Sequence, residues 1–152
     1  MPFRNNAILL VDDSSSDVEL AVHALKQGRF ASSVTVAEDG QAALDYLFCR
    51  GVHKDRRAVD RPTVILLDLK LPKIDGLQVL KILRADDRTR AIPIVILTSS
   101  KEPKDLAEGY KLGASAFIQK PVDFEDFRNT IQEIGAFWLV TNQPPPREAF
   151  LD

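Results

Sequence analysis

The sequence alternates between short apolar runs and longer segments in which apolar residues recur every three or four positions. Short aliphatic runs bounded by polar residues and turn formers predict β-strands. The predicted strands are AILLV (7–11), SVTVAE (33–38), TVILLDL (63–69), IPIVILT (92–98) and ASAFIQK (114–120). The first, third and fourth are nearly continuous in aliphatic residues, which is typical of a parallel sheet covered by helices on both faces.

The segments between and after these runs have the spacing of amphipathic helices. We predict helices over 15–29, 40–50, 75–87, 103–112 and 123–139. In the last segment one apolar stripe at steps of three and four contains Phe124, Phe127, Ile131, Ile134 and Trp138. Ser16 and Glu19 have the spacing of a capping box for the first helix. Five strand–helix repeats predict the α/β class, with a doubly wound five-stranded parallel sheet and helices on both faces.

Two stretches depart from the repeat. Residues 49–61, CRGVHKDRRAVDR, form a charged insertion that we interpret as a solvated loop. The C-terminal tail has three consecutive prolines, which favour an extended conformation over a helix. With 152 residues the chain is expected to hold one domain, at 1–140, followed by a proline-containing tail at 141–152.

Composition excludes several classes of protein. The chain is 45% hydrophobic and 28% charged, which is typical of a globular protein. A formal net charge of −2 gives no sign of nucleic-acid binding, and no apolar run is long enough to span a membrane. The single cysteine, Cys49, excludes an internal disulfide and is consistent with a cytoplasmic protein.

Carboxylates follow two of the apolar strands directly. Asp12 and Asp13 end the first strand, and Asp68 ends the aliphatic run of the third. Ligands of doubly wound sheets bind beyond the carboxyl ends of the strands, so we expect these three groups to meet there. They would repel one another unless a cation neutralised them, and oxygen ligands without histidine or cysteine favour Mg²⁺, or Mn²⁺ in its place. Taken singly, each aspartate is more typical of a helix cap or a turn.

Two further polar residues fall at the same expected edge. Thr98 ends the fourth strand, and Lys120 ends the fifth, directly before Pro121. A lysine in this place would neutralise part of the carboxylate cluster and could bind a phosphate oxygen as a point charge. Each residue alone has an ordinary structural explanation, but their coincidence at four strand ends indicates a functional site.

With the motifs ILLVDD, VILLDLKLPKIDG, IVILTSS and AFIQKP, the sequence resembles response-regulator receiver domains, which are the phosphorylated partners of sensor histidine kinases. The resemblance covers about residues 5–140. It implies a flavodoxin-like sheet of strand order 2-1-3-4-5 and a phosphoacceptor protein that assists its own phosphorylation and dephosphorylation, rather than an enzyme. Gly76 falls where the family has a glycine in the turn after the acceptor strand.

The resemblance also implies the roles of the site residues. Asp68 would be the phosphoacceptor, and Mg²⁺ would be held by Asp12, Asp13, Asp68 and the backbone carbonyl of Lys70. Thr98 would bind the phosphoryl group and act as a switch, and Lys120 would pair with it, with a cis peptide bond before Pro121. The second switch position is Phe117, where many receivers have tyrosine; we expect weaker coupling between phosphorylation and the position of this ring, because phenylalanine has no hydroxyl to satisfy.

The insertion and the ending EIGAFWLVTNQPPP are similar to stand-alone receivers that serve bacterial and cyanobacterial phytochromes. This resemblance implies a phytochrome kinase as partner and a homodimer formed through the fourth helix, fifth strand, fifth helix and tail. The expected dimer face contains Phe127, Ile131, Ile134, Phe137 and Trp138. Phe137, Leu139 and Val140 lie outside the apolar stripe and would leave an exposed patch on a monomer. The alternative is a tail that folds back over its own domain.

Other functions fit the sequence less well. Nucleotide triphosphatases and dinucleotide-binding enzymes need a glycine-rich loop after the first strand, and this chain has DDSSSD there. Phosphatases with an aspartyl nucleophile generally have a second aspartate two positions later, where this chain has Lys70. A pseudo-receiver that acts only as a protein-binding module stays open as the alternative function.

Overall fold

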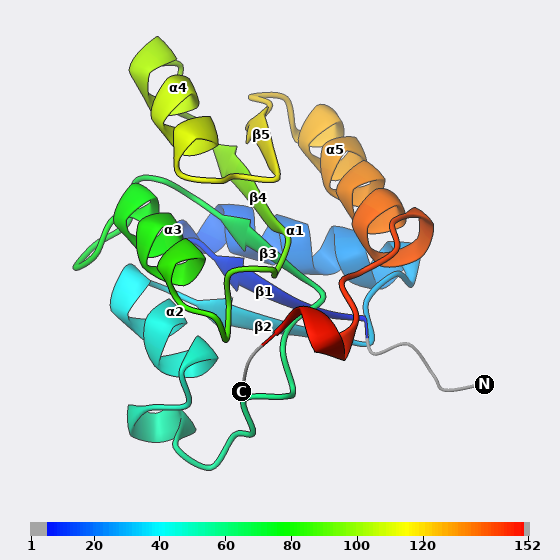
Figure 1. The fold of residues 1–152 in the computed structure, drawn as a ribbon. Helices are drawn as coiled ribbons and strands as arrows, with labels where there is room; N and C mark the ends of the chain where they lie inside the picture. Colours follow the sequence, from blue (N-terminus) through cyan, green and yellow to red (C-terminus); the bar gives the residue numbers. More distant parts are fainter. Residues whose placement is uncertain (1–5, 151–152) are drawn as a thin grey trace.

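The computed structural model describes residues 6–150, and the element at its centre is a five-stranded sheet in the order β2-β1-β3-β4-β5 (Figure 1). All neighbouring strands are parallel. The strands are β1 (Ala7–Val11), β2 (Ser33–Ala37), β3 (Val64–Leu67), β4 (Ile94–Thr98) and β5 (Ala116–Gln119). The predicted fold class and strand order are therefore confirmed. Residues 1–5 of the predicted domain and 151–152 of the predicted tail lie outside the described residues.

Within residues 6–150, five α-helices cover the two faces of the sheet (Figure 1). The helices α1 (Ser15–Gly28) and α5 (Phe124–Ala136) pack on one face. The helices α2 (Gly40–Leu47), α3 (Gly76–Ala85) and α4 (Pro103–Lys111) lie on the other. Side chains of a strand point alternately to the two faces, so Leu9 of β1 contributes to the core under α2 and α3, and Ile8 to the core under α1 and α5. This alternation explains why β1, β3 and β4 are apolar at nearly every position.

Short polar side chains at the helix N-termini fix where the helices begin. Asp39, Asp75 and Asp123 each accept a hydrogen bond from the backbone N–H three residues later, which caps α2, α3 and α5. Ser14 caps α1 by accepting from the N–H of Asp17 at 3.4 Å. The predicted capping box of Ser16 and Glu19 is thus wrong, because the N-cap is Ser14, two residues before Ser16.

The C-terminal end of α5 departs from the predicted continuous helix. The α-helix ends at Ala136, and a π-helical turn follows at Phe137–Thr141. Because this wider turn changes the angular position of the residues after it, Leu139 lies fully buried in the core, although the sequence placed it outside the apolar stripe. At the other end of the stripe, Phe124 is 57% exposed.

The predicted dimer face divides into two groups. Phe127, Ile131 and Ile134 are buried between α5, α1 and the sheet. These three side chains already pack inside their own domain, so their assignment to a dimer face is wrong. Phe137 is 48% exposed, and Trp138 is half-buried with its ring against that of Phe137.

The C-terminal tail folds back beneath the amino ends of the central strands (Figure 1). The Phe150 ring packs against the core on the α2 and α3 side, and the guanidinium of Arg61 lies 4.0 Å from its centroid. Part of the 49–61 insertion is also packed: Arg56 lies over the Tyr46 ring and donates to the Tyr46 carbonyl. No helix within residues 6–150 has both the length and the hydropathy to cross a membrane.

Candidate functional site

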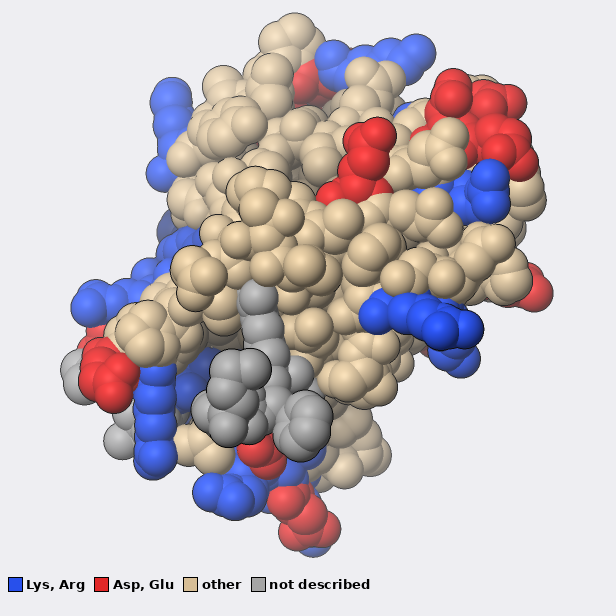
Figure 2. Space-filling model, turned by 90° about the vertical axis from the view of Figure 1, so that its right-hand side faces the viewer, with Lys and Arg blue, Asp and Glu red and all other residues tan. Residues whose placement is uncertain are grey.

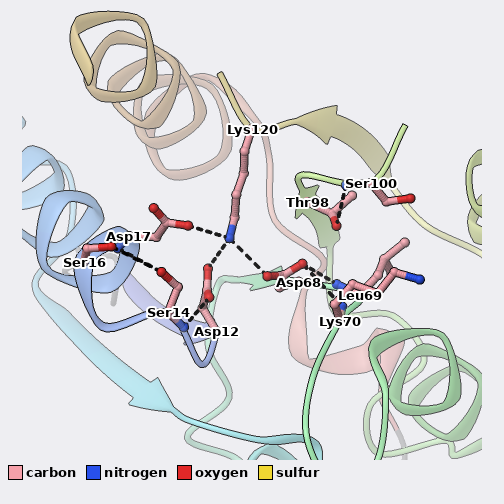
Figure 3. A network of polar contacts seen from close by, with 10 residues as sticks. All are labelled: Asp12, Ser14, Ser16, Asp17, Asp68, Leu69, Lys70, Thr98, Ser100 and Lys120. Atoms are coloured by element: carbon pink, nitrogen blue, oxygen red, sulfur yellow. Dashed lines mark hydrogen bonds and ion pairs between the residues drawn. The ribbon is translucent and has the colours of Figure 1, made fainter. Parts of the chain in front are cut away.

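Four polar side chains lie buried at the carboxyl edge of the sheet: Asp12, Asp68, Thr98 and Lys120 (Figure 3). Each follows or ends a different strand, and the parallel register places these strand ends side by side. In particular, Val11 pairs with Leu67, so the aspartates that follow them are neighbours. The sequence prediction that these groups share one edge is met by the geometry.

The ammonium of Lys120 is the centre of a charge network. Its Nζ donates to Asp12 Oδ2 at 2.8 Å, to Asp17 Oδ2 at 2.9 Å and to Asp68 Oδ2 at 3.0 Å (Figure 3). Burial alone would lower the pKa of Lys120, but the hydrogen bonds that it donates to Asp12 and Asp17 and the charge of Asp68 outweigh burial, so this pKa is raised above its ordinary value. Lys120 is therefore a fixed positive charge at neutral pH.

The remaining oxygens of the two buried aspartates accept backbone hydrogen bonds. Asp12 Oδ1 accepts from the N–H of Ser14 at 2.9 Å, and Asp68 Oδ1 accepts from the N–H of Leu69 at 2.7 Å. These bonds fix the orientation of both carboxylates. Burial raises the pKa of Asp12 even though Lys120 and Ser14 act in the opposite direction. Because the carboxylates of Asp12, Asp17 and Asp68 all contact one ammonium, the cluster has more carboxylates than protein cations.

Asp13 completes a group of three carboxylates. Asp12, Asp13 and Asp68 each offer one oxygen, and these oxygens lie within 4.8 Å of one another. Asp13 is exposed to solvent, unlike the other two. An all-oxygen donor set with an open, hydrated side fits Mg²⁺ or Mn²⁺, which keep several water ligands. The residues present therefore fit a divalent cation.

The surrounding predicted residues have distinct positions. The Thr98 hydroxyl oxygen accepts a hydrogen bond from the N–H of Ser100 at 3.3 Å. The backbone N–H of Lys70 lies 3.4 Å from Asp68 Oδ1, while its side chain is 72% exposed. Gly76 is needed for close packing, because a Cβ there would lie 2.2 Å from the Asp68 carbonyl oxygen. Phe117 lies apart from the carboxylates, half-buried against Gly109 and the Tyr110 ring.

Asp17 is a site residue that the sequence analysis missed. It occupies the first turn of α1, and its carboxylate reaches Lys120 from the side opposite Asp68 (Figure 3). In the sequence it is one of several polar residues after the first strand, and an acidic residue in a first helical turn is explained by the helix dipole alone. The sequence feature that could have identified Asp17 is its position five residues after Asp12, in the first turn of the helix that follows the site.

The peptide bond between Lys120 and Pro121 corrects another expectation. No cis peptide bond occurs among residues 6–150, so this bond is trans and not cis. Trans is the intrinsically favoured isomer before proline, by about 0.5–1 kcal/mol. The trans bond is compatible with the three contacts that Lys120 makes to carboxylates.

With this geometry established, comparison with known proteins identifies the family. The model of the response regulator receiver domain matches residues 8–132. The chain therefore belongs to the receiver domains of response regulators, the signalling proteins of two-component systems. The receiver resemblance seen in the sequence is confirmed.

Particular relatives refine this class. The probable methanogenesis regulatory protein FilR2 of Methanothrix harundinacea is 39% identical over 91% of this chain and 86% of its own length. Response regulator Rcp1 of Synechocystis is 35% identical over 88% of this chain and 89% of its own. The crystal structure of the Mn²⁺-bound form of Rcp1 matches with a TM-score of 0.87 over 93% of this chain and 99% of that one, at 34% identity. The bacteriophytochrome response regulator AtBRR matches with a TM-score of 0.71 and 48% identity, over 91% of this chain and 98% of its own. The narrower resemblance to response regulators of phytochromes is thus also confirmed.

Proposed function

We propose that the protein is a response regulator whose receiver domain accepts a phosphoryl group from a sensor histidine kinase on Asp68, with Mg²⁺ bound by Asp12, Asp13, Asp68 and the carbonyl of Lys70. The observation that carries this proposal is the bond from Lys120 to Asp68 within a cluster that keeps an excess of negative charge. Rcp1, a relative of similar length, has a Mn²⁺-bound crystal structure, which supports a divalent cation in this place.

The chain's own residues account for most of the chemistry. An oxygen of Asp68 attacks the phosphorus, the bond from phosphorus to the donor nitrogen breaks, and the donor histidine keeps the electron pair of that bond. When bound, the divalent cation supplies positive charge that reduces the repulsion between the carboxylate and the phosphoryl oxygens. Lys120 stabilises the charge that develops on those oxygens, and the Thr98 hydroxyl donates a hydrogen bond to one of them after transfer. The product is an acyl phosphate, whose lability suits a signal that must decay.

A docking face for the kinase lies next to the site. Val122, two residues after Lys120, is 97% exposed, and Phe124 beside it is largely exposed. Phe124 also lines a hollow of about 420 Å³ with Leu20 and His23 of α1. An apolar surface this close to Asp68 suits the helix of a kinase that carries the phosphorylated histidine. The similarity to AtBRR, a bacteriophytochrome response regulator, supports a phytochrome as that kinase.

The other exposed apolar surface supports a homodimer. Phe137 and Val140 project at the end of α5, next to a hollow of about 320 Å³ lined by Ile118, Glu133 and Trp138. Figure 2 shows the side of the molecule on which the end of α5 lies, and uncharged residues cover most of its centre. A projection and a hollow on one surface can pair with themselves about a two-fold axis. Phe137→Ser should then convert the dimer to a monomer in sedimentation, whereas a monomeric wild type would refute the dimer.

Intact mass after incubation with Mg²⁺ and acetyl phosphate tests the phosphoacceptor. The wild type should gain the mass of one phosphoryl group, and Asp68→Asn should gain none, because an amide oxygen is too poor a nucleophile. Omission of Mg²⁺ should suppress the gain in the wild type. If the folded wild type gains nothing from acetyl phosphate or from a kinase, the pseudo-receiver that only binds proteins becomes the better account.

A further inference from the structure

A third buried carboxylate, that of Asp105, lies outside the cluster around Lys120. It belongs to the first turn of α4 and is only 6% exposed. Its Oδ2 accepts a hydrogen bond of 2.5 Å from the Ser100 hydroxyl and lies 3.6 Å from Lys70 Nζ. The Ser100 hydrogen bond and the charge of Lys70 lower the pKa of Asp105, so it is ionised. None of the proposed chemistry uses this residue.

On one side, Asp105 connects to the switch hydroxyl. The Ser100 hydroxyl donates a hydrogen bond to Asp105, and the Ser100 backbone N–H donates one to Thr98 Oγ1. The Ser100 oxygen in turn accepts from the N–H of Glu102 at 3.3 Å. These bonds hold residues 99–102 and the start of α4 in one arrangement. In that arrangement the Thr98 hydroxyl oxygen accepts a hydrogen bond from the Ser100 N–H (Figure 3).

On the other side, Asp105 connects to the phosphoacceptor strand. Lys70 follows Asp68 by two residues, and its ammonium crosses to α4 beside a groove of about 530 Å³. This groove is lined by Asp13, Lys70, Lys104 and Asp105, among others, so it opens next to the proposed metal site. Both ends of the network, Thr98 and Lys70, therefore border the place where a phosphoryl group on Asp68 would lie.

We propose that Asp105 is a positioning residue that latches the loop 99–102 to Lys70 in the resting protein, and that phosphorylation opens this latch. The proposal rests on the proposed function of Asp68. A phosphoryl group brings about two negative charges to Asp68, and these attract the Lys70 ammonium away from Asp105. The same group draws the Thr98 hydroxyl, which moves the loop that carries Ser100. Each change weakens one bond to Asp105, so the start of α4 is released.

Asp105→Asn tests the latch with little change in shape. The amide oxygen can still accept from Ser100, but it no longer attracts Lys70. The Lys70 side chain of this ion pair is largely exposed, which weakens the pair, so we expect phosphoryl uptake from acetyl phosphate to rise by about two- to fivefold. In the unphosphorylated protein, hydrogen exchange of the Ser100 amide should rise by a similar factor. Thermal unfolding would establish that the variant is folded, and Ser100→Ala provides a second way to open the latch.

Two controls separate a latch from general electrostatics. Glu102→Gln removes the same charge from the same loop, at an exposed residue whose side chain does not cap α4; it should leave Ser100 exchange unchanged. In a Lys70→Gln background, Asp105→Asn should have no further effect on Ser100 exchange. An effect of Asp105→Asn that persists undiminished without Lys70, or that Glu102→Gln reproduces, would overturn the latch. Because Ser100 exchange is measured without phosphate, this result is independent of whether Asp68 accepts a phosphoryl group.

Discussion

Lys120 and Arg84 are both partly or fully buried cations, but Lys120 binds charged groups and Arg84 binds neutral ones. Lys120 Nζ bonds to three carboxylates at the carboxyl edge of the sheet. Arg84, at the end of α3, donates to the carbonyl oxygens of Gly113, Arg90 and Ile92, and Nη2 lies 3.3 Å from the Ser115 hydroxyl. Burial lowers the pKa of Arg84, whereas the carboxylates raise that of Lys120.

This difference separates a structural contact from a functional one. The neutral partners of Arg84 satisfy its hydrogen-bond donors and leave no excess negative charge. Through these bonds the side chain joins α3 to the loops before β4 and β5. The carboxylates around Lys120 outnumber it, and Asp13 adds another charge nearby. Such a cluster remains short of positive charge, which is what we expect of the proposed site for a divalent cation and a phosphoryl group. We infer that charge imbalance, rather than burial, marks the functional site.

Removal of Lys120 should have the largest effect on stability. In EDTA, Lys120→Met leaves buried carboxylates without their protein cation, and we expect a loss of about 3–5 kcal/mol in the free energy of unfolding. Millimolar Mg²⁺ should restore part of the lost stability, because the cluster without Lys120 is more negative and binds the cation. Urea denaturation with and without Mg²⁺ measures the loss of stability and its recovery. Lys81→Met, at an exposed position of α3, is the control; equal stability of the two variants would contradict the account.

Removal of Arg84 should have the next largest effect. Arg84→Ala deprives three carbonyls of their donor, which predicts a loss of about 2–3 kcal/mol. In contrast to Lys120→Met, this loss should be independent of Mg²⁺, and phosphoryl uptake well below the melting temperature should be unchanged. Arg90→Ala removes only an exposed ion pair to Asp87 and serves as the matched control. If Mg²⁺ restored the stability of Arg84→Ala, the distinction drawn between Arg84 and Lys120 would be wrong.

Asp17→Asn should have the smallest effect and sharpens the comparison. Asp17 accepts from Lys120 on the side opposite Asp68, so its negative charge offsets part of the ammonium charge that would repel a cation. We expect the variant to bind Mg²⁺ about two- to fivefold more weakly by calorimetry, as for other partly exposed ion pairs. Glu19→Gln, an exposed residue of the same helix, should bind as the wild type does. If Asp17→Asn binds Mg²⁺ more tightly, Asp17 competes with the ion instead of assisting it.

The sequence predicted the sheet and much of the site because both depend on local patterns. Strands covered on two faces are apolar at nearly every position, and residues that follow parallel strands share one edge. Asp12, Asp13, Asp68, Thr98 and Lys120 could all be found in this way.

The features that were missed depend on tertiary geometry. Asp17 reaches Lys120 only because α1 begins at Ser15, and the sequence favoured a later capping pair. Leu139 enters the core because a π-helical turn replaces the last turn of α5, which no periodicity of 3.6 predicts. Phe150 packs under the sheet beside Arg61, although the prolines before it indicated only an extended chain.

Calorimetric titration of Mg²⁺ into the unphosphorylated wild type, beside Asp13→Asn, tests the central claim most directly. Asp13 is exposed and makes no contact that the fold requires among those described, so its loss should affect the ion alone. The account predicts one saturable site per chain in the wild type and clearly weaker binding in Asp13→Asn, with unchanged stability in EDTA. A wild type that binds no Mg²⁺, or a variant that binds it equally well, would contradict the conclusion that the carboxylates around Lys120 form a cation site.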